Sequence, residues 1–304
     1  MASKLAGPSA DLVGRLALGT AQFGLDYGIN NTAGRPTDTT VQDILRTARA
    51  AGITLLDTAV AYGDSEARLG VITFGQEGES PAFEVVTKLA AGPAPQVLHQ
   101  LQESLLRLRR RSVYGALFHG FGAFRQEAGA WPGLRQARAS GLVQRIGLSL
   151  YHPQEAEWLL ETGLDVDLVQ VPFNMLDQRF GPLLPELARR GVEVHVRSAF
   201  LQGLLLRTPQ DLPAFFAPLC PKLERLHDLA WAAEVPLPAL LLHFAAYAPG
   251  VARVVIGVDT VANLRENLAA AAYQEQAEQL RPTLREMAET TDDLILPYAW
   301  PPRS

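Results

Sequence analysis

Short apolar runs alternate with amphipathic stretches along almost the whole chain. The apolar runs are rich in Val, Ile and Leu, which is typical of strands that are buried on both faces. They predict strands at 16–21, 54–58, 84–88, 114–119, 145–150, 168–172, 194–199 and 254–258. The stretches between them repeat apolar residues at helical spacing and predict helices at 40–51, 66–72, 94–109, 132–140, 153–161, 182–190, 222–233, 237–247, 261–272 and 276–290.

This alternation of eight strands with helices predicts an α/β fold, a (β/α)8 TIM barrel. The alternative is a doubly wound open sheet, which commonly carries a G-x-G-x-x-G turn after its first strand. The first predicted strand instead leads into Gly19-Thr20-Ala21-Gln22-Phe23-Gly24, which does not match that turn. Since no linker, low-complexity tract or internal repeat interrupts the alternation, we expect residues 1–304 to form a single barrel domain.

Three consecutive predicted strands end on side chains that can polarise a carbonyl group. Asp57, Lys88 and His119 each end an apolar run, and Tyr62 comes five residues after Asp57. Parallel strands of a barrel end on one rim, where barrel enzymes carry their active sites. One charged residue at a strand end is commonly a cap or a surface charge, but four such groups in consecutive units favour a catalytic site. We call Asp57, Tyr62, Lys88 and His119 the tetrad.

The tetrad suits proton donation to a carbonyl oxygen. A phenol with a pKa of ~10 is a weak acid at neutral pH, and a neighbouring ammonium makes it stronger by favouring the ionised form. Asp57 would keep the amine of Lys88 charged and in place, while His119 could donate a hydrogen bond to the same oxygen. Because none of these groups supplies electrons, reduction of a carbonyl needs a hydride donor, and a nicotinamide cofactor is the expected one.

Two other kinds of chemistry fit the sequence less well. A metal site needs clustered ligands, but the histidines are scattered and no H-x-H or H-E-x-x-H pattern occurs. We therefore expect no metal. A barrel isomerase or lyase that forms a Schiff base on Lys88 needs a neutral amine, whereas a lysine beside Asp57 should remain charged.

Composition narrows the classes of partner. The formal net charge is −5, which argues against a nucleic-acid or anionic-membrane surface. No apolar run approaches the ~18 residues of a membrane span, and residues 1–14 lack the apolar core of a signal peptide. The single cysteine, Cys220, excludes an internal disulfide and fits a reducing compartment. We therefore expect a cytoplasmic protein that acts on a small molecule; no feature of the pattern indicates an oligomeric state.

The longest irregular stretches are 24–39 and 202–221. Both follow predicted strand ends, so both would lie on the rim that carries the tetrad. Long loops on an active rim commonly form substrate walls or lids.

The segment Asp57-Thr58-Ala59-x-x-Tyr62-Gly63 resembles the signature of the aldo-keto reductases. Further segments resemble that family in the same order along the chain: Leu18-Gly19-Thr20-Ala21, Val86-Thr87-Lys88, His119, Ile146-Gly147-Leu148-Ser149, Gln170-Val171-Pro172-Phe173-Asn174, Val255-Ile256-Gly257-Val258 and Leu264-Arg265-Glu266-Asn267-Leu268. The resemblance covers almost the whole chain. It implies a (β/α)8 barrel with an extended nicotinamide cofactor across its rim, with Tyr62 as general acid, Lys88 and Asp57 as its helpers, and His119 orienting the carbonyl.

The resemblance also implies a set of cofactor contacts. Ser149 and Gln170 would hold the nicotinamide carboxamide, a loop after the seventh strand would cover the pyrophosphate, and residues after the eighth strand would hold the adenosine. The implied contacts are Gly19, Thr20, Ala21, Asp57, Ser149, Gln170, Arg197, Ser198, Phe200, Gln202, Gly203, Gly257, Val258, Asp259, Asn263 and Asn267. For the substrate we expect contacts from Phe23, Tyr27, Tyr62, His119 and Phe121.

Departures from the family pattern bear on the cofactor. Leu150 stands where the family often has Asn, and Arg197 stands where many members stack a Tyr on the nicotinamide, although a guanidinium also stacks on aromatic rings. Members that prefer NADPH commonly carry a cation just after the last strand. This chain has Asp259 there, which could accept a ribose hydroxyl instead. We expect NADP as the family default, with NAD as the alternative that the charge of Asp259 favours.

Together these observations predict an NAD(P)H-dependent oxidoreductase that reduces an aldehyde or ketone to the alcohol. The segment 19–28 is similar to a bacterial subgroup found with cell-surface sugar genes, which hints at a sugar-like carbonyl. The alternative is a redox sensor or interaction module that binds the cofactor with little turnover, as some relatives do. The intact tetrad argues against that alternative.

Overall fold

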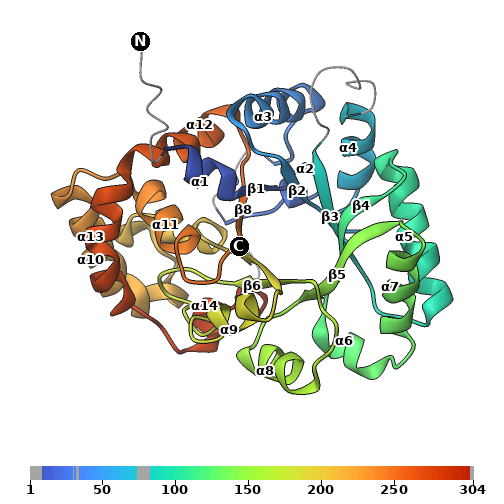
Figure 1. Ribbon diagram of the computed structural model, residues 1–304. Coiled ribbons are helices and arrows are strands. Elements are labelled where there is room, and N and C mark those ends of the chain that lie inside the picture. Colours follow the sequence, from blue (N-terminus) through green and yellow to red (C-terminus); the bar gives the residue numbers. More distant parts are fainter. Residues whose placement is uncertain (1–8, 30, 32–33, 74–82, 302–304) are drawn as a thin grey trace, which may run out of the picture.

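The computed structural model describes residues 9–29, 31, 34–73 and 83–301. Eight parallel strands close into a barrel with helices around it (Figure 1). Because β8 pairs with β1, the sheet has no free edge, which confirms the (β/α)8 barrel and excludes the open sheet. The strands are β1 (Leu16–Gly19), β2 (Leu55–Asp57), β3 (Glu84–Leu89), β4 (Val113–Phe118), β5 (Val143–Ser149), β6 (Leu168–Pro172), β7 (Glu193–Arg197) and β8 (Arg253–Gly257).

The strand register sorts side chains to the inside and outside of the barrel. Gly19 lies opposite both Asp57 and Gly257, and Lys88 lies opposite Leu117, so these residues share the inner face. An apolar plug fills the middle of the barrel, made of the buried residues Ala17, Leu55, Val86, Leu117 and Leu168. The polar residues that face inward at the carboxyl ends of the strands therefore lie above an apolar floor.

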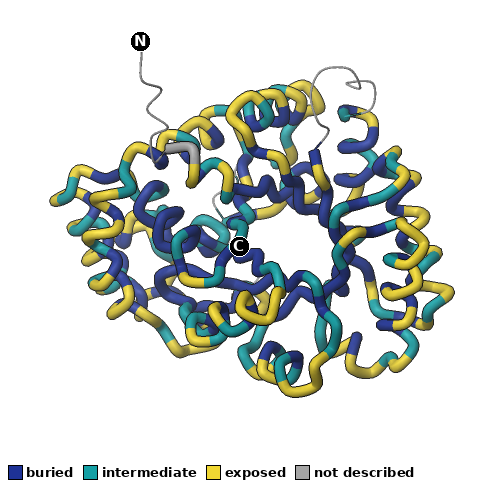
Figure 2. The backbone as a smooth tube through the Cα atoms, in the orientation of Figure 1, coloured by how far each residue is buried: buried dark blue, intermediate teal, exposed yellow. Residues whose placement is uncertain are grey.

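The helices end where their local sequence provides caps. At the start of α3 (Asp38–Ala51), the Thr37 hydroxyl accepts a hydrogen bond from the backbone N–H of Thr40, and Gly52 ends the helix in the left-handed conformation. The barrel-facing sides of the helices are buried and their outer sides exposed (Figure 2). The other α-helices are α1 (Ser9–Arg15), α2 (Ala21–Gly24), α4 (Ser65–Thr73), α5 (Ala94–Leu108), α6 (Phe121–Gln126), α7 (Ala130–Ala139), α8 (Pro153–Thr162), α9 (Leu184–Arg189), α10 (Cys220–Ala232), α11 (Leu237–Ala246), α12 (Val261–Ala269), α13 (Gln274–Arg285) and α14 (Asp292–Ile295).

Every predicted strand and helix overlaps an observed one, but the rim differs from the prediction. The sequence pattern does not predict α1, α2, α6 or α14. Residues 30, 32 and 33 of the predicted loop 24–39 lie outside the described residues. The stretch 202–221, expected to be irregular, contains 3₁₀ helices at Leu201–Leu206, Pro209–Asp211 and Ala214–Leu219. The first of these is interrupted at Gln202 and Gly203, which both have positive φ, while the other two contain prolines, which cannot donate a backbone hydrogen bond.

Within the described residues, no single helix is long and apolar enough to cross a membrane. One pair passes that test only when taken together, Ala214–Ala232 with Leu237–Ala246, and it is bent by 103° at the break.

Gly24 packs closely against the backbone of Tyr62, so a side chain at this position should destabilise the fold. A Cβ at Gly24 would lie 1.8 Å from the carbonyl oxygen of Tyr62. We expect Gly24→Ala to lower the free energy of unfolding by about 1–3 kcal/mol, the usual cost of overpacking. In the control Gly14→Ala, the new Cβ has nothing within 4 Å, so urea denaturation should show no loss of stability. Equal effects of the two variants would contradict the tight contact at Gly24.

Candidate active site

The tetrad residues come together where the second, third and fourth strands end. Lys88 Nζ donates hydrogen bonds to Asp57 Oδ1 at 2.5 Å and to the backbone carbonyl of Thr58 at 3.2 Å. It also lies 3.5 Å from the hydroxyl oxygen of Tyr62. The rings of Tyr62 and His119 meet edge to face, with centroids 5.7 Å apart. The four groups predicted from strand ends therefore form one continuous contact chain on the rim.

The ion pair at the centre of this chain is buried. Asp57 is 3% exposed and Lys88 1% exposed. The second carboxylate oxygen of Asp57 accepts a hydrogen bond from Gln170 Nε2 at 2.8 Å, so both oxygens have partners. Burial by itself would lower the pKa of Lys88, but the charge of Asp57 and its hydrogen bond outweigh that effect and raise it. Lys88 is therefore held as an ammonium beside the phenol of Tyr62.

His119 has the opposite electrostatic surroundings. Burial, followed by the positive charges of Lys88 and Arg197, lowers the pKa of His119 to about 4. Its imidazole is consequently neutral at neutral pH, and a neutral imidazole carries one N–H that can donate a hydrogen bond. A neutral donor next to Tyr62 can orient a carbonyl oxygen without competing to protonate it.

A buried set of hydroxyl groups anchors the segment between Asp57 and α4. The Thr20 hydroxyl donates to the carbonyl oxygen of Asp57 at 3.0 Å, and the Ser65 hydroxyl lies 2.9 Å from the Thr20 hydroxyl. The Thr58 hydroxyl in turn donates to Ser65 at 3.3 Å. The backbone N–H of Ser65 also donates to the carbonyl oxygen of Tyr62. These bonds fix the loop that presents the Tyr62 phenol.

One cavity of about 350 Å³ runs along the rim past the tetrad. It is lined by every residue that the resemblance assigns to the cofactor, from Gly19, Thr20 and Ala21 to Gly257 and the first turns of α12. Tyr27, Tyr62 and His119 also line it. A cavity of this size that gathers apolar walls and converging polar groups is typical of a small-molecule site. The assignment of each residue to a ligand stays a prediction.

A family model described as the aldo/keto reductase family matches residues 15–283. The chain belongs to the aldo/keto reductase family.

Solved structures support the same fold. An aldo-keto reductase from Pseudomonas aeruginosa is 25% identical with a TM-score of 0.66, and the match covers 86% of this chain and 90% of that one. The holo form of an aldo-keto reductase from Bacillus halodurans is 18% identical with a TM-score of 0.72, covering 92% and 95%. At 18% identity, the second likeness concerns the fold alone.

Curated relatives match over shorter stretches. A chloroplastic pyridoxal reductase from Arabidopsis thaliana is 31% identical over 159 residues, which are 46% of this chain and 44% of the relative. A D-threo-aldose 1-dehydrogenase from a Pseudomonas species is 28% identical over 155 residues, 48% of this chain and 47% of the relative. The matched part of the chain thus spans less than half the length of each of these two relatives.

Two of the expected substrate contacts lie elsewhere in this reductase. Phe23 lies in the short helix α2, is fully buried in the hydrophobic core and does not line the cavity, so the prediction that it forms a substrate wall is wrong. Phe121 does not line the cavity either. Its ring packs against Phe124 and Trp158, with centroids 6.1 and 5.5 Å away.

Tyr151 is a cavity residue that the sequence analysis missed. The guanidinium of Arg197 lies over the Tyr151 ring, 4.1 Å from its centroid, and donates to the carbonyl oxygen of Leu150. Arg197 was expected to stack on the nicotinamide, and here one face of it is covered by Tyr151. Tyr151 directly follows the predicted strand 145–150, so its place at a strand end was the available signal.

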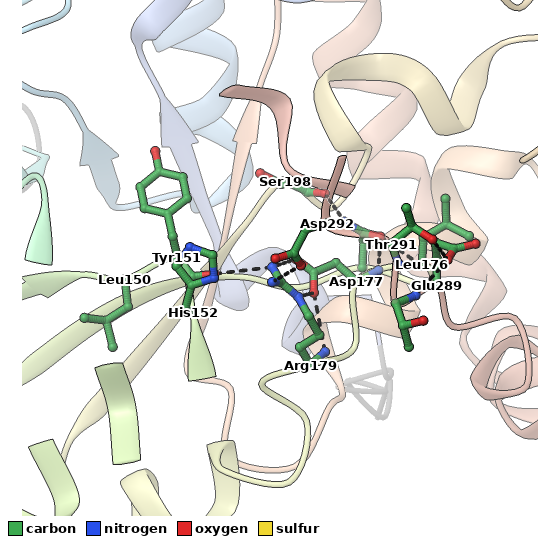
Figure 3. Close-up of polar contacts among 12 residues, drawn as sticks. Leu150, Tyr151, His152, Leu176, Asp177, Arg179, Ser198, Glu289, Thr291 and Asp292 are labelled. Carbon is green, nitrogen blue, oxygen red and sulfur yellow. Dashed lines mark hydrogen bonds and ion pairs between the residues drawn. The ribbon is translucent and has the colours of Figure 1, made fainter. Parts of the chain in front are cut away.

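The segment near the carboxyl end of the chain supports Tyr151 from outside the cavity. Arg179 pairs with Asp177 and Asp292 and donates to the carbonyl oxygen of Tyr151 at 3.3 Å (Figure 3). The ring of Tyr298 meets that of Tyr151 edge to face, with centroids 5.4 Å apart. Contacts between segments that are far apart in sequence therefore hold the Tyr151 wall of the cavity in place.

No group of three or more His, Cys, Asp or Glu residues that could hold a metal occurs among the residues described.

The buried ion pair predicts non-additive stabilities. Lys88→Met leaves the Asp57 carboxylate buried without its ammonium, which should cost about 3–5 kcal/mol. The double variant Lys88→Met with Asp57→Asn carries no buried charge at this place, so we expect it to be more stable than Lys88→Met alone. Urea denaturation of the single and double variants measures this coupling. A double variant destabilised by the sum of the two single effects would contradict it.

The low pKa of His119 predicts the protonation state of its ring. In the unfolded chain an imidazole titrates near ~6.5, so between that pH and about 4 the unfolded state binds the extra proton and the native state does not. Stability should therefore fall as pH falls through this window, and His119→Gln should remove that part of the loss. Nitrogen-15 imidazole spectra should show His119 neutral at pH 5.5. A charged His119 ring at that pH would refute the assignment.

Proposed function

We propose that this aldo/keto reductase is an NAD(P)H-dependent enzyme that reduces an aldehyde or ketone to the alcohol, with Tyr62 as general acid. The observation that carries the proposal is the contact of Lys88 Nζ with both Asp57 and the Tyr62 hydroxyl, beside a cavity large enough for small-molecule binding. We further propose that the chain works as one catalytic domain. The lone cysteine, Cys220, is our reason to propose a cytoplasmic location.

The side chains divide the work of protonating the carbonyl oxygen. Tyr62 gives its proton to that oxygen, and the Lys88 ammonium stabilises the phenolate left behind. Asp57 holds Lys88 charged and in place, while the neutral His119 donates a hydrogen bond that aims the oxygen at Tyr62. When bound, a dihydronicotinamide supplies the hydride that the carbonyl carbon accepts.

The residues along the cavity fit a nicotinamide dinucleotide. Gln170 already donates one N–H to Asp57, so its side-chain carbonyl oxygen can accept a hydrogen bond from the nicotinamide carboxamide. The Ser149 hydroxyl can donate to the oxygen of the same carboxamide. Gly19 and Gly257 face each other across neighbouring strands on the cavity wall. A Cβ at Gly257 would lie 2.2 Å from Nε2 of Gln22, which also lines the cavity, so a larger residue at this position would displace that side chain.

For the substrate we propose a polar aldehyde, with a sugar-like carbonyl as the first class to test. Tyr27 and Tyr151 line the cavity near the tetrad and offer flat rings with hydroxyl groups, which suit the face and edges of a hydroxylated molecule. Two relatives are named for an aldose and for pyridoxal, both of which carry a polar carbonyl.

Tyr62→Phe tests the role of the phenol. The variant keeps the ring but has no proton to give, so we expect turnover with NADH or NADPH to fall by about 10²–10⁴-fold, the range for loss of a general acid. Tryptophan fluorescence should show cofactor binding unchanged. The control Tyr273→Phe removes a hydroxyl outside the cavity and should leave turnover intact. Undiminished turnover in Tyr62→Phe, or tight cofactor binding without turnover in the wild type, would refute the proposal.

A further inference from the structure

We infer that this cavity selects NADH over NADPH, because the described residues that line the end expected to receive the adenosine ribose include carboxylates and no Lys or Arg. The inference rests on the proposed function, since it takes the cavity to hold a nicotinamide dinucleotide. It departs from the NADP that the family resemblance implies.

The barrel fixes which end of the cavity receives the adenosine. His119 follows β4, and Asp259 follows β8. In a closed ring of eight strands these two lie four strands apart in either direction, on opposite sides of the rim (Figure 1). The nicotinamide ring must sit beside Tyr62 and His119 for hydride to reach a carbonyl held there. An extended dinucleotide that begins at the tetrad therefore ends at Asp259 and the first turns of α12.

Charges at that end are negative. Asp259 and Glu266 both line the cavity there, and the negative charge of Asp26 acts on Asp259. Arg197 is the one Lys or Arg among the described residues that line the cavity, and its guanidinium lies over the Tyr151 ring and donates to the carbonyl oxygen of Leu150, both of which follow β5. A 2′-phosphate would bring further negative charge to a place that already holds carboxylates, which costs binding free energy in a partly buried site.

Asp259 itself has an unused acceptor. Its Oδ1 atom is buried and has no hydrogen-bond partner among the described residues. Burial and the charge of Asp26 raise the pKa of Asp259, because both disfavour the ionised carboxylate. A buried acceptor without a donor is costly, and a ribose hydroxyl is a donor of the right kind. The free 2′-hydroxyl of NADH can donate to it, whereas the 2′-phosphate of NADPH cannot.

The start of α12 already uses the backbone N–H of Asn263 within the helix cap, so this group is not free to bind a phosphate. The Thr260 hydroxyl already accepts a hydrogen bond from the backbone N–H of Asn263, so the helix supplies its own cap there. Arg265, the cation of α12 that could have paired with a phosphate, is exposed and is not among the described lining residues.

Binding measurements test the inference without relying on turnover. Tryptophan fluorescence titration of the full chain with NADH and with NADPH should give a dissociation constant at least about tenfold lower for NADH, a difference of 1.4 kcal/mol. Adenosine 5′-monophosphate and adenosine 2′,5′-bisphosphate, which differ only in the 2′-phosphate, should show the same order as competitors. Because neither competitor carries a nicotinamide, their relative affinities report on the adenosine end of the cavity and not on the tetrad.

Substitutions of Asp259 test whether this residue causes the preference for NADH over NADPH. Asp259→Asn should narrow the NADH:NADPH ratio and Asp259→Lys should reverse it, while Asp228→Asn, which removes an exposed charge outside the cavity, should leave it unchanged. Equal affinity for both cofactors, tighter NADPH binding, or a ratio that ignores Asp259 would overturn the inference while leaving the proposed function standing. Failure of both cofactors to bind would overturn the proposed function and this inference together.

Discussion

The buried ion pair between Asp57 and Lys88 is the interaction on which the site depends. A lone carboxylate or ammonium at this depth would be strongly disfavoured, so each group requires the other. Their pairing holds the amine of Lys88 against the Tyr62 hydroxyl, and Gln170 completes the shell of the carboxylate. The charge that stabilises a phenolate is thus built into the native state before any substrate arrives.

The barrel places this charged layer above an apolar plug. The apolar plug lies beneath the rim, and such low-polarity surroundings strengthen the electrostatic interactions above it. The same closed ring also separates the two ends of the cavity. The Lys88 ammonium belongs to the tetrad and the Arg197 guanidinium lies over Tyr151, whereas Asp259 and Glu266 follow β8. A ligand that extended from the tetrad to α12 would therefore meet carboxylates at its far end.

Strand periodicity allowed much of this arrangement to be predicted from the sequence. Asp57, Lys88 and His119 end three consecutive apolar runs, and parallel strands bring such ends to one rim, so local pattern was sufficient for the tetrad. Phe23 was misplaced because the direction of its ring depends on the short helix α2, which the pattern does not reveal. Tyr151 and its supports were missed because they depend on contacts between segments far apart in sequence, such as those of Arg179 with Asp292. The hydrogen bond between the hydroxyls of Ser65 and Thr20 could not be predicted either, because it joins segments far apart in sequence.

Deuterium transfer tests the central claim most directly. The full chain would be given cofactor deuterated at the transferable C4 position together with a panel of aldoses and aromatic aldehydes, and the alcohol products analysed by mass spectrometry and proton NMR. The account predicts one deuterium on the former carbonyl carbon, and a large loss of transfer when Tyr62 is changed to Phe. Unlabelled alcohol, or transfer that proceeds equally well without the phenol, would contradict it.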